Sequence, residues 1–298
     1  MEREIVTDES QREVKMHGTA EFPFSIGYED ILYYDGKRFA CHWHKEIELA
    51  YVYSGKIKIQ VNHKDYIVSA GECLFSNANA LHMGWAIDDQ SCSYFAITLD
   101  PSMFGREEGI IRKRYIDPIL ENPSLPSFLF HDDGDWQSTV LEKIRGMELL
   151  YRERPLGFEL EITALLLSVW KLFYINEKDC HLSPDIHAEK YDRMKSILSY
   201  IHGNYRSKIT LYDMARAANV SKSECSHSFK DYMRETPFEY LLRYRVEQSI
   251  ALLEKPDGTI TETALSVGFT SASYYTEVFK RYMGITPREY KRARETGK

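Results

Sequence analysis

The C-terminal third of the chain contains a sequence block that occurs twice. SFKDYMRETPFEY (Ser228–Tyr240) and VFKRYMGITPREY (Val278–Tyr290) align at an offset of 50 residues, with Phe, Lys, Tyr, Met, Thr, Pro, Glu and Tyr at the same places. Upstream of these blocks, Ala215 corresponds to Ala264. A repeat of this length indicates one supersecondary unit built twice. The pattern of short helix, tight turn and second helix is that of a helix-turn-helix, whose second helix enters a major groove of DNA.

Capping signals support the helix starts in both copies, since Thr210-x-x-Asp213, Ser221-x-x-Glu224 and Thr259-x-x-Glu262 each place a hydroxyl three residues before a carboxylate. Pro237 suits the first turn of a long connecting helix. The expected helices are Leu211–Ala218, Lys222–Met233, Pro237–Glu254, Ile260–Val267 and Ser271–Met283.

Charge is divided unevenly along the chain. The 298 residues have a net charge of −7. From Lys190 onward there are 19 Lys and Arg against 13 Asp and Glu, so this part carries +6 and residues 1–189 carry −13. A basic region behind an acidic one is typical of a protein in which one domain meets a polyanion.

The region from Gly27 to Leu99 alternates between apolar and polar residues and contains turn residues. It predicts a strand before a turn at Asp35-Gly36, two strands joined at Ser54-Gly55, a further turn at Asn62–Asp65, and a late strand over Cys92–Leu99. Short strands at this spacing indicate an all-β sandwich or barrel.

From Trp136 to Asn176 the apolar residues follow a helical period, and Pro155 separates two segments. The second segment is so apolar that it must pack on the barrel or on a second subunit. Its longest apolar stretch, Ile162–Trp170, is too short to span a bilayer. The expected divisions are an N-terminal arm at 1–20, a barrel at 21–133, a helical dimerisation and packing segment at 134–178, a linker at 179–190 and a DNA-binding domain at 191–293.

Five scattered cysteines without a C-x-x-C pair fit reduced thiols. The first residues lack the cationic and apolar segments of a signal peptide. We therefore expect a cytoplasmic protein without a membrane partner.

Residues 191–293 resemble the DNA-binding domain of the AraC/XylS family of bacterial transcription regulators. The resemblance implies an all-α domain in which two helix-turn-helix units, joined by a long helix, bind successive major-groove segments. The residues that carry it are Ala264, Gly268-Phe269, Tyr274-Tyr275, Phe279-Lys280, Gly284, Thr286-Pro287 and Tyr290, with Ala215, Ser221, Phe229-Lys230, Thr236-Pro237, Tyr240 and Arg245 in the first unit.

The N-terminal region resembles the cupin barrels that often serve as the sensing domain of such regulators. Gly36-x5-His42-x-His44-x3-Glu48-x6-Gly55 matches the first cupin motif, and Gly71 followed by His82 resembles the second, although Ser69 and His63 depart from it. The implied fold class is therefore α+β with two domains: an antiparallel β-barrel of the double-stranded β-helix type followed by helices, and then an all-α domain.

The exposed faces of the two recognition helices are the expected DNA contacts. Hydroxyls and amides can read base edges, alanine can meet a thymine methyl, and lysines suit phosphates. Phe229 and Phe279 are instead expected in the core. The candidate DNA-binding residues are Lys222, Ser223, Ser226, His227 and Lys230 in the first unit, and Ala272, Ser273, Thr276, Glu277 and Lys280 in the second.

Two residues depart from the family pattern. Glu277 stands where a basic or polar residue is usual, so it either accepts from a cytosine amino group or repels phosphate. Arg234 replaces the glycine that ends the second recognition helix, Gly284, so a left-handed cap there would be strained and the first unit is expected to close differently. Arg243 and Arg245 are either phosphate contacts or structural residues, and a buried ion pair is expected for Arg245.

His42, His44 and Glu48 share a parity if they lie on one strand, so all three side chains can point into the barrel with His82. Three imidazoles and a carboxylate suit Fe, Mn, Ni or Zn. The alternatives are metal-free contacts to an organic effector, or a purely structural role. The candidate effector-binding residues are His42, His44, Glu48, His82, Trp43, Tyr53 and Trp85; aromatic planes beside polar groups make a carbohydrate one candidate effector.

The sequence thus predicts a transcription regulator, not an enzyme, with no catalytic residues and no required cofactor. Its expected partners are promoter DNA, a small-molecule effector, a second copy of the chain and, for an activator, RNA polymerase. The alternative is a metal-dependent sensor or a cupin metalloenzyme that uses His42, His44, Glu48 and His82. Such an enzyme would leave the 50-residue repeat without a role.

Overall fold

The computed structural model describes residues 5–8, 11–122, 124–177, 188–253 and 258–296. The chain divides into two compact units, Met1–Ala188 and Glu189–Lys298, and each is described by itself. The linker predicted at 179–190 lies outside the described residues except for its last three, which belong to a helix.

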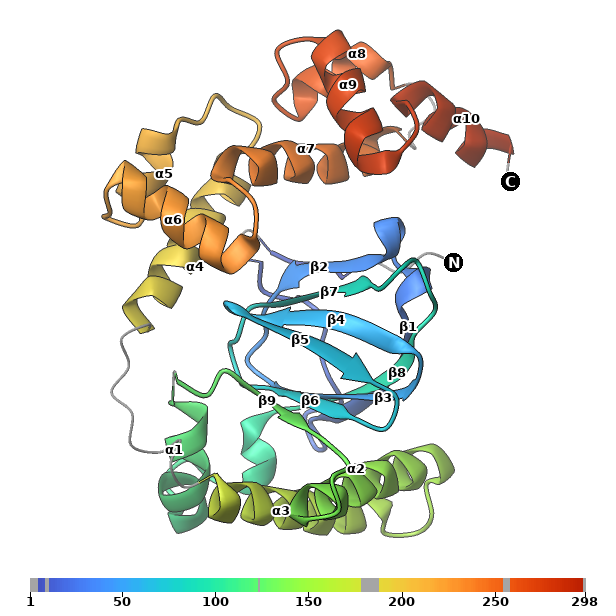
Figure 1. The fold of residues 1–298 in the computed structure, drawn as a ribbon, viewed down its shortest axis with the longest axis vertical. Coiled ribbons are helices and arrows are strands. Elements are labelled where there is room, and N and C mark those ends of the chain that lie inside the picture. The colour runs from blue at the N-terminus through green and yellow to red at the C-terminus, as the bar shows by residue number, and fades with distance from the viewer. Residues whose placement is uncertain (1–4, 9–10, 123, 178–187, 254–257, 297–298) are drawn as a thin grey trace. The chain divides into compact units, whose positions relative to one another are not determined.

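Two antiparallel sheets face each other in the N-terminal unit (Figure 1). The larger has the strand order β1-β8-β3-β6-β9 and the smaller β2-β7-β4-β5. The strands are β1 (Phe24–Asp30), β2 (Arg38–His42), β3 (Ile47–Ser54), β4 (Lys56–Val61), β5 (Lys64–Ser69), β6 (Cys73–Ser76), β7 (His82–Ala86), β8 (Ser93–Leu99) and β9 (Ser127–Phe130). This is the cupin-like pair of sheets that the sequence predicts.

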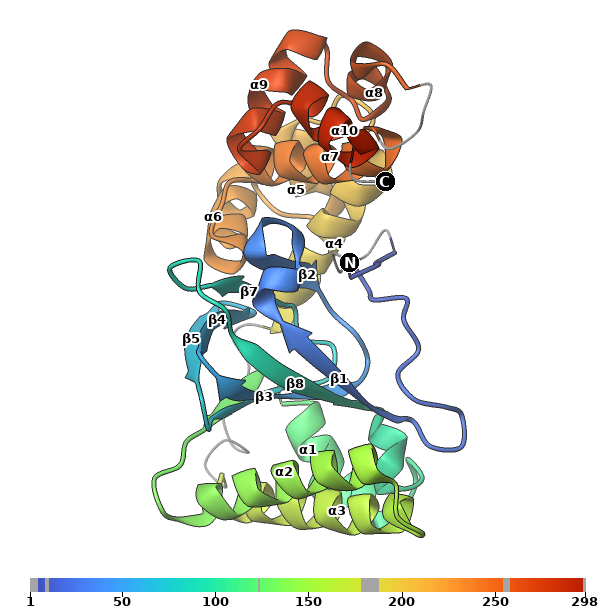
Figure 2. The same ribbon diagram turned by 90° about the vertical axis from the view of Figure 1, so that its right-hand side faces the viewer.

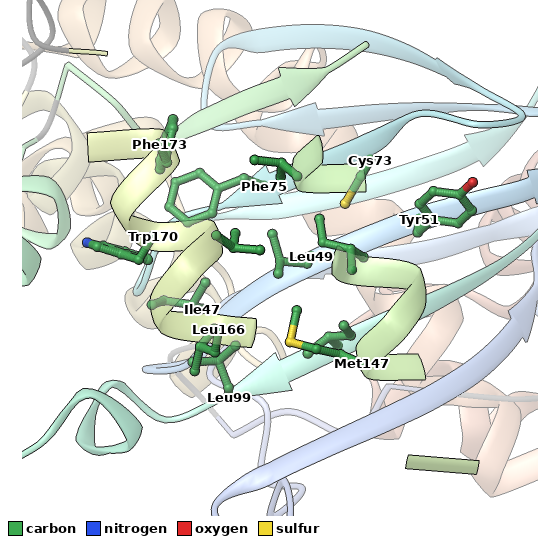
Figure 3. Close-up of a cluster of buried hydrophobic side chains, with 14 of the residues drawn as sticks. Ile47, Leu49, Tyr51, Cys73, Phe75, Leu99, Met147, Leu166, Trp170 and Phe173 are labelled. Atoms are coloured by element: carbon green, nitrogen blue, oxygen red, sulfur yellow. The ribbon is translucent and has the colours of Figure 1, made fainter. Parts of the chain in front are cut away.

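Two helices, α2 (Trp136–Glu153) and α3 (Phe158–Asn176), cover the outer face of the larger sheet (Figures 1 and 2). Because strand residues alternate between faces, β3 sends Ile47, Leu49 and Tyr51 toward these helices. Figure 3 shows the resulting apolar cluster, in which the side chains of β3 meet Leu166 and Trp170 of α3. The helical segment therefore buries its apolar face on the barrel.

One predicted strand is absent. Ile31–Tyr33 and Asp35–Lys37 form short 3₁₀ helices, and β2 begins only at Arg38. The Asp30 carboxylate accepts from the main-chain N–H of Leu32 and from Ser93 Oγ, which ends β1 and starts the first 3₁₀ turn. The turns predicted after Ser54 and at Asn62–Asp65 are present.

Residues 11–17 of the predicted arm pack on the barrel. The Trp43 main-chain N–H donates to the Gln11 carbonyl, and the Glu13 N–H donates to the Trp43 carbonyl. Gln11 and His17 are both buried. This part of the arm is therefore ordered beside the end of β2. The sequence had allowed either an arm or a frayed terminus.

The C-terminal unit is helical, as predicted. Thr210 and Thr259 form reciprocal capping boxes with Asp213 and Glu262, and Ser221 caps the helix that follows it. The helices of the C-terminal unit are α4 (Ala188–Asn204), α5 (Leu211–Ala217), α6 (Lys222–Met233), α7 (Pro237–Leu253), α8 (Ile260–Ser266), α9 (Ala272–Met283) and α10 (Pro287–Thr296). The helices α1 (Asp117–Leu120), α2 and α3 belong to the N-terminal unit. No helix among the described residues is long and apolar enough to cross a membrane.

Phe229 and Phe279 are fully buried in their helices α6 and α9, as predicted. Gly268 in the second turn has φ +91°, and a Cβ there would lie 2.5 Å from the Tyr205 carbonyl oxygen. The motif residue Gly268 is therefore required by both its backbone conformation and its close approach to the end of α4.

The two recognition helices end in the same way with different residues. Arg234 at the end of α6 has φ 57° and Gly284 at the end of α9 has φ 77°, both left-handed. The N–H of each donates to the carbonyl of a lysine four residues earlier. The expectation that the first unit closes differently is therefore wrong: Arg234 adopts the same left-handed cap as Gly284. The non-glycine cap costs about 1 kcal/mol relative to glycine.

Arg234→Gly should raise the free energy of unfolding of the helical unit by about 1 kcal/mol, because glycine adopts this conformation without strain. Gly284→Ala is the matched control, and should lower the free energy by a similar amount. Urea denaturation followed by circular dichroism measures both. A stability loss in Arg234→Gly would mean that contacts of the arginine side chain outweigh its backbone strain.

Candidate ligand pocket and DNA-binding face

A pocket of about 970 Å³ lies in the N-terminal unit. Its walls come from β1, from alternate residues of β8 and β3, from β2 and β4, from the 3₁₀ turns and from the arm. They combine aromatic rings with carboxylates and hydroxyls. The residues that define these walls include Glu13, His17, Ser25, Glu29, Tyr33, Tyr34, Phe39, His42, Glu48, Tyr94 and Thr98.

Three histidines meet beside this pocket, and of these His42 lines it. His42 ends β2, His82 begins β7 directly opposite it, and His44 lies in the connection to β3. Their nearest ring nitrogens lie within 4.8 Å of one another. The prediction that His42, His44 and Glu48 share one strand is wrong, because the chain leaves β2 after His42 and enters the other sheet at Ile47. The side chains converge across this crossing instead.

Main-chain carbonyls hold the three imidazoles in one orientation. Nδ1 of His42, His44 and His82 lies 2.9, 3.1 and 3.0 Å from the carbonyl oxygens of Ala40, Glu46 and Ala80. Because a carbonyl oxygen can only accept, each Nδ1 carries the proton and each Nε2 keeps its lone pair. Nε2 of His44 and of His82 is buried without a hydrogen-bond partner.

Glu48 of β3 completes the group. Its Oε2 lies 3.4 Å from His44 Nε2 and 3.9 Å from His82 Nε2. Burial opposes its charge, but the adjacent imidazoles of His44, His82 and His42 outweigh burial and hold the pKa of Glu48 well below its ordinary value. Burial lowers the pKa of His42 and of His82. The pKa of His44 is raised, because the nearby carboxylates outweigh its burial.

The group is arranged as a metal site requires. Lone pairs converge, the ring orientation is fixed by hydrogen bonds at the other nitrogen, and a carboxylate is adjacent. Buried polar atoms are normally paired, and the three histidines together could hold a metal ion.

A second group of polar side chains in the pocket, Tyr34, Glu29 and Tyr94, was not predicted from the sequence. Tyr34 donates to Glu29 at 3.2 Å, and Tyr94 is adjacent to Tyr34. Burial raises the pKa of both tyrosines, so both stay neutral donors. The alternation of β1 could have placed Ser25, Gly27 and Glu29 on one face, but no inward face was assigned to that strand.

Five residues predicted to contact an effector are not among those that line the pocket: His44, His82, Trp43, Tyr53 and Trp85. His44 and His82 lie next to His42 in the histidine group. Trp43 lies against the arm, with the Arg12 guanidinium 5.8 Å from its ring. Tyr53 shares the parity of Tyr51, so it contacts Tyr51 and Phe95 on the outer side of the sheet. Trp85 has the Lys58 ammonium over its ring.

In the C-terminal unit, α6 and α9 present corresponding faces. Ser223, His227 and Lys230 are exposed on α6, as are Ser273, Glu277 and Lys280 on α9. Ser226, Ala272 and Thr276 are half-buried, and Lys222 is exposed with its ammonium over the Tyr212 ring. Thr276 donates to the carbonyl of Ala272, so its oxygen remains able to accept.

The two arginines of α7 have structural contacts. Arg243 is buried and ion-paired with Glu235 at 2.6 Å and Glu247 at 2.8 Å. Arg245 is also buried, but it donates to the carbonyls of Tyr205 and Ser207 after α4. The buried ion pair expected for Arg245 is therefore formed by Arg243 instead.

A double-sheet domain with a ligand-sized pocket, in one chain with two helix-turn-helix units, defines a ligand-binding transcription regulator. Comparison with known families agrees. A model of the AraC-like ligand binding domain matches residues 31–150, and a helix-turn-helix domain model matches residues 214–293.

Among curated proteins, the HTH-type transcriptional regulator YdeC of Bacillus subtilis is 30% identical over 97% of this chain and 99% of its own length. The melibiose operon regulatory protein of Escherichia coli is 24% identical over 84% of this chain and 83% of its own. Wild-type ToxT of Vibrio cholerae, solved with an unsaturated fatty acid, has a TM-score of 0.41 at 18% identity over 90% of this chain and 94% of its own. The chain belongs to the AraC family of helix-turn-helix transcriptional regulators, with an N-terminal AraC-like ligand-binding domain, and it is not an enzyme.

The histidine group should contribute little to the stability of the metal-free protein. His82→Leu removes one hydrogen bond to Ala80 but also removes an unpartnered buried nitrogen, so the free energy of unfolding should change by less than about 1 kcal/mol. His202→Leu is the comparison, because it removes the hydrogen bond between His202 Nε2 and the Tyr240 hydroxyl at 2.8 Å and also the stacking of the imidazole on the Tyr244 ring, whose centroid lies 3.9 Å away. It should lose about 1–3 kcal/mol. Chemical denaturation in the presence of a chelator measures both, and a larger loss in His82→Leu would indicate a structural role.

Proposed function

We propose that the N-terminal pocket binds the effector of this AraC-type regulator, and that α6 and α9 bind promoter DNA. The pocket supports the first part of this proposal: it is large enough for a small organic molecule, and polar side chains stand among the aromatic ones in its walls. The contacts proposed for the effector are His42, Glu48, Glu29, Tyr34 and Tyr94. Because promoter DNA lies in the bacterial cytoplasm, the protein acts there.

A carbohydrate is the proposed effector class. Tyr33, Tyr34 and Phe39 offer flat apolar surfaces, and Glu29 and Glu48 offer acceptors for several hydroxyls. The printed name of one relative, the melibiose operon regulatory protein, indicates a sugar-related operon for that protein. This supports the same effector class here.

Dimerisation through α3 is the proposed means by which effector binding changes DNA binding. Its outer face exposes Leu160, Ala164, Leu167 and Ile175, while Lys171 lies on the same face. Glu159 and Glu161 begin the helix, so two antiparallel copies would bring these acids near the partner's lysine. Effector binding would then change how two DNA-binding units are presented to a promoter, and an activator would contact RNA polymerase there.

DNA binding should depend on Lys222 and Lys230 as phosphate contacts. Replacing both with alanine should weaken binding to all duplexes, and should reduce the slope of log K against log salt by about 2. Lys56→Ala, an exposed lysine of the N-terminal unit, is the control and should change neither value. Fluorescence anisotropy at several salt concentrations measures both quantities; an unchanged slope in the double variant would contradict the assignment.

A metal-dependent sensor is the second candidate, because Nε2 of His44 and His82 is buried without a hydrogen-bond partner. His42, His44, His82 and Glu48 would hold a divalent transition metal, which would supply an electrophilic centre for effector oxygens. The remaining pocket residues would orient that effector.

Cobalt(II) titration of the full chain should give visible absorption that saturates at about one ion per chain. His44→Ala should abolish that absorption and the effector response while leaving the affinity for DNA unchanged. His202→Ala should leave the absorption intact. Absence of cobalt binding with an intact effector response would favour metal-free contacts, and loss of DNA binding in His44→Ala would mean that His44 is needed for folding.

A further inference from the structure

The two recognition helices carry side chains of different chemistry at one corresponding position. His227 of α6 and Glu277 of α9 align at the 50-residue offset of the repeat. Each lies close to the residue four positions later, and these two neighbours carry opposite charges: His227 Nε2 lies 3.5 Å from Asp231 Oδ2, and Glu277 Oε1 lies 3.0 Å from Arg281.

The backbone makes the two positions equivalent. Both helices have 12 residues, begin after a serine whose hydroxyl caps the third helical residue, and end in a left-handed residue. Phe229 and Phe279 are fully buried, each about one turn before the C-terminal end of its helix. His227 and Glu277 are therefore each the sixth residue of an identically anchored helix, with 78% and 66% of their side chains exposed.

Lys222 corresponds to Ala272, and Lys222 is the residue proposed as a phosphate contact. The other candidate contacts on the two faces are nearly the same. Ser223 corresponds to Ser273, Ser226 to Thr276, and Lys230 to Lys280. A hydroxyl both donates and accepts, and lysine prefers phosphates, so these shared residues distinguish bases poorly. Any difference in what the helices read must come mainly from the position that differs most in chemistry.

Histidine and glutamate differ in hydrogen-bond character. An imidazole N–H donates, and guanine presents two acceptors and no donor in the major groove. An ionised carboxylate only accepts, and cytosine presents an amino donor there. We propose that His227 and Glu277 give the two helices different base preferences: α6 selects guanine and α9 selects cytosine at the corresponding step. This inference rests on the proposed DNA binding by α6 and α9.

The neighbouring charges fit this assignment. Arg281 lies beside Glu277, so its positive charge offsets the repulsion between the carboxylate and DNA phosphates. An exposed ion pair between residues one helical turn apart, such as Glu277 and Arg281, contributes little to stability. A stabilising role alone therefore does not explain Glu277. On α6, Asp231 holds the imidazole on the exposed face.

The test is selection of binding sites by the full-length protein from a random duplex library of about 30 base pairs. The wild-type motif should contain two subsites about one helical turn apart, one with guanine and one with cytosine. His227→Glu combined with Glu277→His keeps the net charge constant, so affinity for unselected duplex should not change. In this variant guanine and cytosine should exchange subsites, with a loss of about ten- to a hundredfold on the wild-type sequence.

A fourfold exchange that adds Asp231→Arg and Arg281→Asp restores one ion pair on each helix, and it should give the same exchanged motif even where the double variant is less stable. An unchanged motif in a folded variant, or an equal loss of affinity on every sequence, would overturn the inference. A wild-type protein that selects no motif would instead overturn the proposed DNA-binding function.

Discussion

The alternation of side chains along β3 is the constraint on which the N-terminal unit depends. Ile47, Leu49 and Tyr51 enter the apolar cluster under α2 and α3, so Glu48 must face the pocket. A slip by one residue would put a carboxylate among apolar side chains and leave the helices without their contact. The helical cover thus stabilises the sheet and sets the position of the carboxylate beside the histidines.

In the C-terminal unit, too, buried residues fix the position of an element while exposed residues of that element can differ. In both copies the buried phenylalanine, the serine cap and the left-handed end define where the recognition helix lies. The exposed positions are free to differ, because they carry no packing role. This is how a repeated scaffold can bind two different DNA segments with one chain.

Much of this could be predicted from the sequence, because the signals are local. Turn residues defined β3, β4 and β5, hydroxyl–carboxylate pairs marked the starts of α5 and α8, and the repeat predicted the two helix-turn-helix units. The predicted histidine group meets in space, although its prediction assumed one continuous strand. Convergence across two sheets depends on the chain crossing after His42, which no local pattern indicates.

The predictions that were wrong also concern positions that tertiary contacts determine. Ile31–Tyr34 has apolar strand-like residues, but hydrogen bonds to Asp30 turn the chain there. Trp43, Tyr53 and Trp85 were chosen by nearness in sequence, whereas strand parity and the arm place them away from the pocket. Glu29 and Tyr34 were missed because their contact joins β1 to a 3₁₀ turn that the sequence did not predict. Burial and tertiary contact, rather than local propensity, decide these positions.

Hydroxyl-radical footprinting of the full chain on a selected duplex tests the central claim most directly, because it maps the contact of each recognition helix separately. Two protected segments per protomer, about 10 base pairs apart on one face of the duplex, are predicted from two helices in successive major-groove segments. Protection of only one segment per protomer would contradict this account, since α6 and α9 would not then both bind DNA.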